Sequence, residues 1–165
     1  MTVPNMMVSR FVVLMVVCQA LFACSIGRSD LDVYFSNIIN GHSGGVFPYK
    51  EKRIEFVCVL QAYQNRVKSK KNVNFVELIN VELERVGFVG SEGKWQLVIL
   101  SDGRIFVDAV DRYVAPLHSP LDGNQGEWRS DVGKNSEECV SGGNVKFVVF
   151  VNERTEERRV GIVSN

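Results

Sequence analysis

The sequence predicts an α+β fold in which an antiparallel sheet wraps a single helix, and two observations carry this prediction. Between Lys50 and Val67, apolar residues recur with the spacing of one helical stripe: Phe56, Val59, Leu60, Tyr63 and Val67. Strand-like runs follow in short succession, and Asp102-Gly103 has the composition of a tight type I′ hairpin turn. A helix followed by an antiparallel meander is an α+β arrangement.

The N-terminal region has the pattern of a signal peptide. Residues 11–23 are almost wholly apolar, Arg10 is the only charge before Arg28, and small residues follow the run. Such a run is shorter than the roughly 20 residues that span a bilayer. We therefore expect residues 1–27 to be removed and the protein to be secreted. An uncleaved anchor, and lipidation of Cys24 in a sequence that loosely resembles a bacterial lipobox, are the alternatives.

Downstream of the signal peptide the chain divides by pattern. Residues 28–43 show no sustained period and are expected to form a loosely held leader segment. Strands are expected over residues 74–85, 94–100 and 105–111, with residues 86–93 as a projecting glycine-rich loop. Residues 119–165 are expected to add a polar linker and a terminal hairpin of residues 145–151 and 158–163. The predicted core joins the helical stripe with Ile79, Val81, Leu97, Ile99, Phe106 and Ala109.

Charge and motif content argue against several function classes. The 19 basic and 19 acidic residues balance, which disfavours nucleic-acid binding. Two histidines leave little material for a metal site, and no nucleophile elbow, phosphate loop or dinucleotide fingerprint occurs. We expect a non-enzymatic protein without cofactor or metal, and without a membrane partner once the signal peptide is removed.

Two cysteines, Cys58 and Cys139, remain after removal of residues 1–27. A secreted chain meets oxidising conditions that favour a disulfide. Cys58 lies in an apolar helical pattern, where an unpaired thiol packs as a small hydrophobe. A bridge and a free buried thiol both remain open.

The segment Gly44–Leu117 resembles the plant cystatins, which inhibit papain-type cysteine proteases. The resemblance rests on short motifs in the family's order: Gly44-Gly45-Val46-Phe47-Pro48, Tyr63-Gln64-Asn65, Asn74-Phe75-Val76-Glu77-Leu78-Ile79, Ser101-Asp102-Gly103 and Ala109-Val110-Asp111. It covers 74 of the 165 residues. The chain departs from the family in its central loop, which has no Gln, and in having Leu117 in place of Trp.

The resemblance implies a cystatin-like domain over residues 44–118 and a secreted inhibitor that inserts a wedge into a protease cleft without covalent chemistry. The residues it implies for protease contact are Gly44, Gly45, Glu84, Arg85, Val86, Gly87, Pro116 and Leu117. The alternative is a diverged cystatin-fold binding protein without inhibitory activity. An enzyme on a related sheet-on-helix scaffold is a further rival, for which no catalytic constellation is found.

Signal-peptide removal predicts a secreted protein that begins near Arg28, because a signal peptidase cuts after small residues such as those at 23–27. N-terminal sequencing of the protein from a secreting host measures this directly. An intact Met1 on the secreted protein would contradict it.

Overall fold

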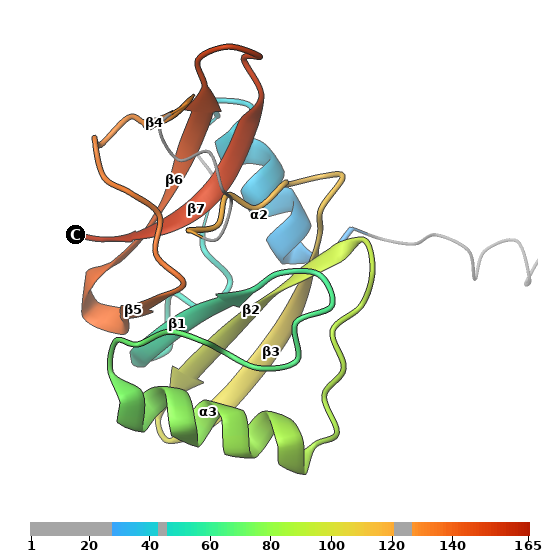
Figure 1. Cartoon of the computed structure of the whole chain (residues 1–165), viewed down its shortest axis with the longest axis vertical. Helices are drawn as coiled ribbons and strands as arrows, with labels where there is room; N and C mark the ends of the chain where they lie inside the picture. Colours follow the sequence, from blue (N-terminus) through green and yellow to red (C-terminus); the bar gives the residue numbers. More distant parts are fainter. Residues whose placement is uncertain (1–27, 43–45, 121–126) are drawn as a thin grey trace, which may run out of the picture.

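The computed structural model describes residues 28–42, 46–120 and 127–165. Over these residues it confirms the α+β class, with two α-helices and seven strands in two antiparallel sheets (Figure 1). In chain order the elements are α2 (Asp30–Ile39), β1 (Ile54–Leu60), α3 (Val73–Arg85), β2 (Lys94–Ser101), β3 (Arg104–Asp111), β4 (Trp128–Ser130), β5 (Cys139–Ser141), η2 (Gly142–Asn144), β6 (Val145–Asn152) and β7 (Arg158–Ser164). The sheets have the orders β3-β2-β1-β5 and β4-β6-β7.

The helix predicted between Lys50 and Val67 is wrong, because residues 54–60 form strand β1. The last five residues of β1 are all buried. A strand covered on both faces reads as a continuous apolar run, and such a run also fits a helical stripe. Tyr63, expected in the core, lies beyond the strand and is 65% exposed.

The strand predicted over residues 74–85 is wrong as well, because Val73–Arg85 is helix α3. Val76, Ile79 and Leu83 are its buried residues, at a spacing that places them on one helical face. Val81 lies off that face and is 59% exposed, so it is not part of the core. A segment of thirteen residues is longer than a typical strand and suits a helix better.

Both predicted hairpins are confirmed. β2 pairs with β3 in one continuous register from Lys94↔Asp111 to Ser101↔Arg104. Asp102 and Gly103 have φ values of 49° and 69°, as the type I′ turn requires. β6 pairs with β7 across the turn that joins them. Turn chemistry was sufficient to predict the first of these units, and two neighbouring apolar runs the second.

The predicted leader segment is wrong for residues 30–39, which form helix α2. Ser29 caps the helix: its Oγ accepts from the Asp32 amide at 3.1 Å, and its own amide donates to the Asp32 carboxylate at 3.3 Å. Leu31 and Phe35 are buried against the first sheet. This segment is therefore an integral part of the core.

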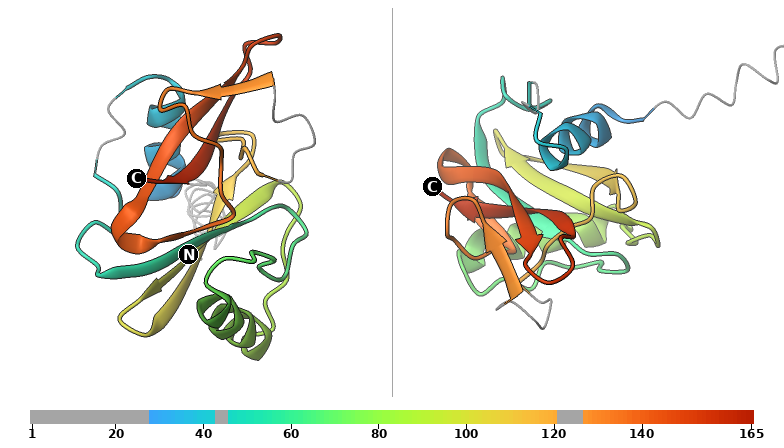
Figure 2. Two further views of the ribbon diagram at one scale, coloured as in Figure 1. Left: turned by 60° about the vertical axis from the view of Figure 1, so that its left-hand side comes forward. Right: turned by 90° about the horizontal axis from the view of Figure 1, so that it is seen from above.

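The first sheet lies between two layers. Seen from above, α2 and α3 lie on opposite sides of it (Figure 2). On the α3 side the largest buried residues are Phe56, Leu60, Ile79 and Leu83. On the α2 side, Phe35, Trp95, Leu97 and Ile99 share a cluster with Val160 and Ile162 of β7. Most of the predicted core is buried, and Phe106 and Ala109 are half-buried.

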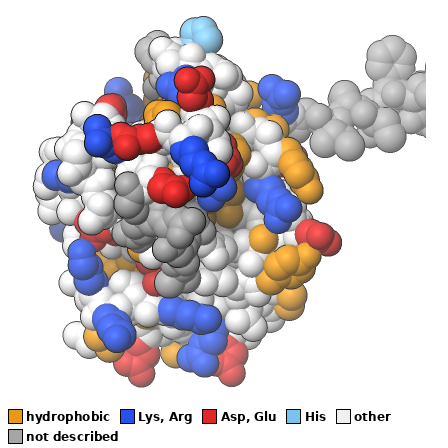
Figure 3. Space-filling view, turned by 45° about the horizontal axis from the view of Figure 1, so that its top comes forward, with side chains coloured by type: hydrophobic (Ala, Val, Ile, Leu, Met, Phe, Trp, Pro, Cys, Tyr) orange, Lys and Arg blue, Asp and Glu red, His pale blue; other side chains and the backbone are white. Residues whose placement is uncertain are grey.

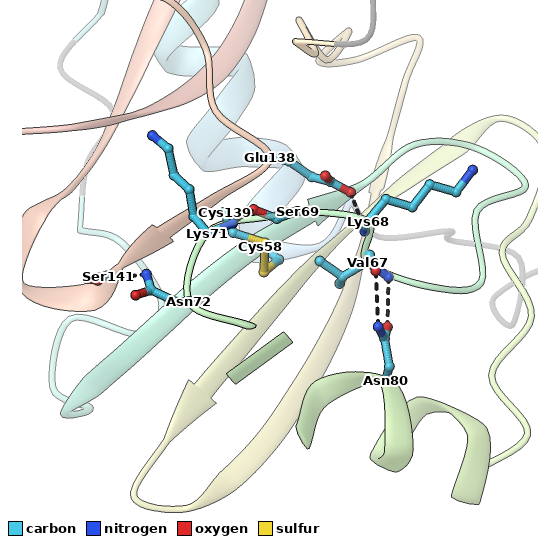
Figure 4. The surroundings of a disulfide bond; sticks show 10 residues. All are labelled: Cys58, Val67, Lys68, Ser69, Lys71, Asn72, Asn80, Glu138, Cys139 and Ser141. Atoms are coloured by element: carbon cyan, nitrogen blue, oxygen red, sulfur yellow. Dashed lines mark hydrogen bonds between the residues drawn. A yellow bond between two sulfur atoms is a disulfide. The ribbon is translucent and has the colours of Figure 1, made fainter. Parts of the chain in front are cut away.

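The C-terminal segment closes this core. β5 pairs with β1 in the first sheet, and Cys139 lies directly opposite Cys58. The two cysteines form a disulfide that spans 81 residues (Figure 4). In the same region the Asn80 side chain holds the Val67 backbone through two hydrogen bonds, of 2.8 and 3.0 Å. Residues 119–165, predicted as an extension, thus contribute a strand and a covalent link to the central sheet.

We expect the Cys58→Ala/Cys139→Ala double variant to lose about 3–5 kcal/mol of unfolding free energy, because the bridge closes a long loop and β5 has only three residues to hold it to β1. Urea unfolding of the variant and the oxidised parent measures the difference. A loss below about 0.5 kcal/mol would show that β5 stays paired without the bridge.

Candidate functional site

Three connecting segments meet where β1 ends, β2 begins and β3 ends. They follow Leu60, precede Lys94 and follow Asp111, and we call this region the loop end. It combines two exposed tyrosines, unpaired cations and an open cleft, and it is the best-defined candidate site among the described residues.

The loop end is held by backbone contacts. A Cβ on Gly90 would lie 2.4 Å from the Gln64 carbonyl oxygen, so only glycine allows the two segments to approach so closely. The Arg112 amide donates to the Gly93 carbonyl at 2.9 Å. The indole Nε1 of buried Trp95 donates to the Ala115 carbonyl at 2.7 Å and ties the third segment to the core. The scaffold beneath the exposed side chains is therefore fixed.

Tyr63 and Tyr113 project from two of these segments, 65% and 78% exposed. Tyr63 has a φ of 65°, a left-handed conformation that is uncommon for a bulky residue and costs about 1–2 kcal/mol. The Arg112 guanidinium lies 5.2 Å from the Tyr113 ring centroid. The fold thus holds an aromatic ring in solvent at an energetic cost.

A cleft of about 450 Å³ opens next to the segments that carry these tyrosines: Ala62 and Arg112, their sequence neighbours, line it, whereas the two tyrosines do not. Its lining residues are Gln61, Ala62, Lys94, Trp95, Arg112, Pro116, Leu117, Glu157 and Arg159. Arg159 pairs with Glu157 at 2.9 Å, whereas Lys94 and Arg112 form no ion pair with any described residue. The cleft therefore has an excess of positive charge, with Pro116 and Leu117 among its apolar lining residues. Elsewhere, charges of both signs are interspersed on the face seen in Figure 3.

Pro116 and Leu117, two of the residues implied for protease contact, line this cleft. The Pro116 carbonyl accepts from the Val160 amide at 2.8 Å, and Leu117 forms a parallel bridge with Val160. These contacts attach the pair to the edge of β7. The pair is thus presented on a rigid support.

The structure does not bring the other described contact residues to the same place. Glu84, Arg85, Val86 and Gly87 lie at the C-terminal end of α3, where Glu84 and Gly87 line a separate hollow. Arg85 forms an ion pair with Glu82 at 2.5 Å. Gly44 and Gly45 lie outside the described residues.

Gly87 has a local structural role. It has a φ of 63°, its amide donates to Glu84, and the next amide, of Phe88, donates to Leu83. These two hydrogen bonds form a Schellman motif, which ends α3 and favours glycine at this position. Phe88 packs into the α3-side cluster with Leu83, whereas Val89 is 79% exposed. The predicted projecting loop begins as a helix cap.

The residues considered for nucleophilic chemistry are engaged elsewhere. Cys58 is in the disulfide, so it holds no free thiol. The His118 ring is buried, with its centroid 4.3 Å from that of Phe150 and 4.9 Å from that of Trp128. His42 is exposed next to α2, away from the disulfide. Among the described residues, the geometry thus does not bring a cysteine thiol and a histidine together.

No protein-family model, curated protein or solved structure matches the chain. The likeness to plant cystatins therefore rests on the sequence motifs alone. Of the helices in the described ranges, none is long and apolar enough to cross a membrane.

Sequence reasoning missed Tyr63, Arg112 and Tyr113. Tyr63 fits the apolar stripe of the expected helix, which assigned it to the core. Arg112 and Tyr113 directly follow a strand that ends at Asp111, and polar or aromatic residues just past a strand are the available signal.

We expect Tyr63→Asn to raise the unfolding free energy by about 1 kcal/mol, because Asn tolerates the left-handed conformation and no buried contact is lost. Tyr113→Asn is the matched control, with an expected change within about 0.5 kcal/mol. Urea unfolding of both variants tests this. Destabilisation by Tyr63→Asn would mean that the ring packs as a structural residue.

Proposed function

We propose that the chain is a secreted, non-catalytic binding module that engages a papain-type cysteine protease through the loop end. The observation that carries the proposal is the solvent exposure of Tyr63, at a strained backbone position, together with Tyr113 and Arg112. Tyrosine and arginine dominate the energetics of protein interfaces, since they supply large contact area with few rotatable bonds or several donors.

The cleft supports this proposal. Pro116 and Leu117 supply apolar area at its rim, and Lys94 and Arg112 supply cations without a described ion-pair partner. Such a surface suits a protein partner that presents acidic groups around an apolar contact. The resemblance to cystatins names a papain-type protease as the partner.

The disulfide supports export. Disulfides persist in oxidising compartments and are rare in the cytosol, and Cys58–Cys139 links the central strand to the C-terminal segment. Together with the signal-peptide pattern, this favours action outside the cell.

The proposal predicts that the oxidised protein inhibits papain reversibly, and that Tyr113→Ala weakens inhibition by about tenfold or more, as loss of an interface hot spot does. Steady-state inhibition measures both effects. Val151→Ala, at another partly exposed apolar residue on β6, is the control and should leave inhibition unchanged.

The Gly87→Arg variant distinguishes protease contact through the loop end from contact through the residues that correspond to the family's central loop. A Cβ on Gly87 meets no atom within 4 Å, so the side chain has room, although the backbone conformation is strained. Inhibition that survives Gly87→Arg and is lost with Tyr113→Ala supports the loop end. The reverse pattern would assign contact to the end of α3, and absence of inhibition by the folded parent would overturn the protease proposal.

The second candidate is a binding module without inhibitory activity, and one observation favours it. The residues that would form the family's central loop instead cap α3 and line a different hollow from Pro116 and Leu117. A wedge needs its contact elements side by side at one edge. A folded protein that does not inhibit papain would support this candidate.

A further inference from the structure

The outer edge of β3 carries backbone groups without partners. β3 is the terminal strand of the first sheet. Ser101 and Arg104 flank a two-residue turn, so they form a hydrogen-bonded pair. In an antiparallel ladder every second residue then points its N–H and C=O groups toward the neighbouring strand, so Arg104, Phe106, Asp108 and Val110 point theirs toward β2. The N–H and C=O groups of Ile105, Val107 and Ala109 consequently point outward.

The backbone contacts at the end of β3 agree with this assignment. The Asp111 amide, next in the outward series, donates to the Asp32 carboxylate at 2.8 Å, and the Arg112 amide points inward to Gly93. α2 thus covers one end of the edge, and the hairpin turn bounds the other. Between them, Ile105, Val107 and Ala109 have no backbone hydrogen bond to any described residue on this side.

Other outer strands in the described chain offer no comparable edge. β4 and β5 have three residues each. The outer side of β7 is already occupied, since Leu117 and Glu137 form bridges with Val160 and Ile162. β3 has eight residues, and those from Ile105 to Ala109 are half-buried. A long unpaired edge is a template for another strand.

The side chains of β3 favour its own sequence as that strand. If two copies pair antiparallel about Phe106, then Ile105 lies opposite Val107 of the second copy, and both residues point outward as pairing requires. In the same register Phe106 lies opposite Phe106. Arg104 lies opposite Asp108 of the second copy, and two-fold symmetry creates this contact twice.

Neither charge has an ion-pair partner of opposite sign among the described residues of its own chain. Arg104 is exposed and forms no ion pair with another residue that the structure describes. Asp108 accepts a hydrogen bond from the Tyr49 hydroxyl, and burial raises the pKa of its carboxyl. Lys52 lies over Phe106, with its Nζ 4.0 Å from the ring centroid, on the same face of the sheet. The charges of Arg104 and Asp108 would oppose pairing with a strand of arbitrary sequence, but in this register each lies opposite the other residue on a second copy.

We propose that this protein self-associates reversibly by antiparallel pairing of β3 with β3 of a second copy, in the register centred on Phe106. The pairing makes one continuous sheet of the two first sheets. It satisfies the outward backbone groups of Ile105 and Val107 and places Arg104 against Asp108 across both halves of the seam. Opposite charges and aromatic pairs in such cross-strand positions are stabilising.

Charge exchange provides the decisive test. Arg104→Asp alone places Asp against Asp twice, and Asp108→Arg alone places Arg against Arg twice. We expect each variant to associate at least about tenfold more weakly than the parent in sedimentation velocity over a concentration series. An equimolar mixture restores one Asp–Arg contact and one Arg–Asp contact, so it should form mixed dimers with near-parental affinity.

Two further variants complete the experiment. Arg154→Asp makes the same charge change in the β6–β7 turn and should leave association unchanged. Val107→Pro removes an outward N–H that has no partner in the described part of its own chain, so it should abolish association while the circular dichroism spectrum is retained. If Asp108→Arg fails to fold, Arg104→Asp and Val107→Pro decide the outcome.

A parent that stays monomeric at every concentration would overturn the proposal. So would folded Arg104→Asp or Val107→Pro protein that associates as strongly as the parent. Tyr113→Ala should leave association unchanged, which keeps this result separate from protease binding at the loop end.

Discussion

The burial of β1 on both faces is the constraint on which the rest of the structure depends. Phe56 and Leu60 face α3, whereas Val57 and Val59 face α2 and the second sheet. A strand with no solvent face needs partners on both edges as well, and β2 and β5 supply them. The last of these partners comes from the far end of the sequence, so the N-terminal and C-terminal halves form one core.

Local chemistry made the two hairpins and the α+β class predictable, because their signals lie within a few residues. The identities of β1 and α3 were exchanged because both segments are apolar enough to fit either period. Tertiary burial decides which segment is the strand and which is the helix. Val73–Arg85 covers one face of a sheet, whereas residues 56–60 lie inside that sheet. The cap of α2 was readable at Ser29 and Asp32 but was missed, since the apolar spacing there is short.

The site was less predictable than the fold. Pro116 and Leu117 were identified through a family motif, and they lie at a cleft. Tyr63 and Arg112 lie in two different connections and Lys94 begins β2, and only the strand order brings these three places to one end of the sheet. The glycines illustrate the same point: Gly87 ends a helix, whereas Gly90 permits the contact that positions the loop end.

The pairing of β1 with β5 also sets the order of events during biosynthesis. Cys139 follows Cys58 by 81 residues, and synthesis adds on the order of ten residues each second, so the central strand waits several seconds for its second neighbour. The β2–β3 hairpin can form in microseconds once it has emerged. Until residues 139–141 have been synthesised, the apolar strand β1 is therefore covered on one edge only, and Cys58 holds a free thiol. β1 avoids pairing with a wrong strand if chaperones cover its free edge during this interval. Cys58 avoids pairing with a wrong cysteine if oxidation occurs only after the C-terminal segment arrives.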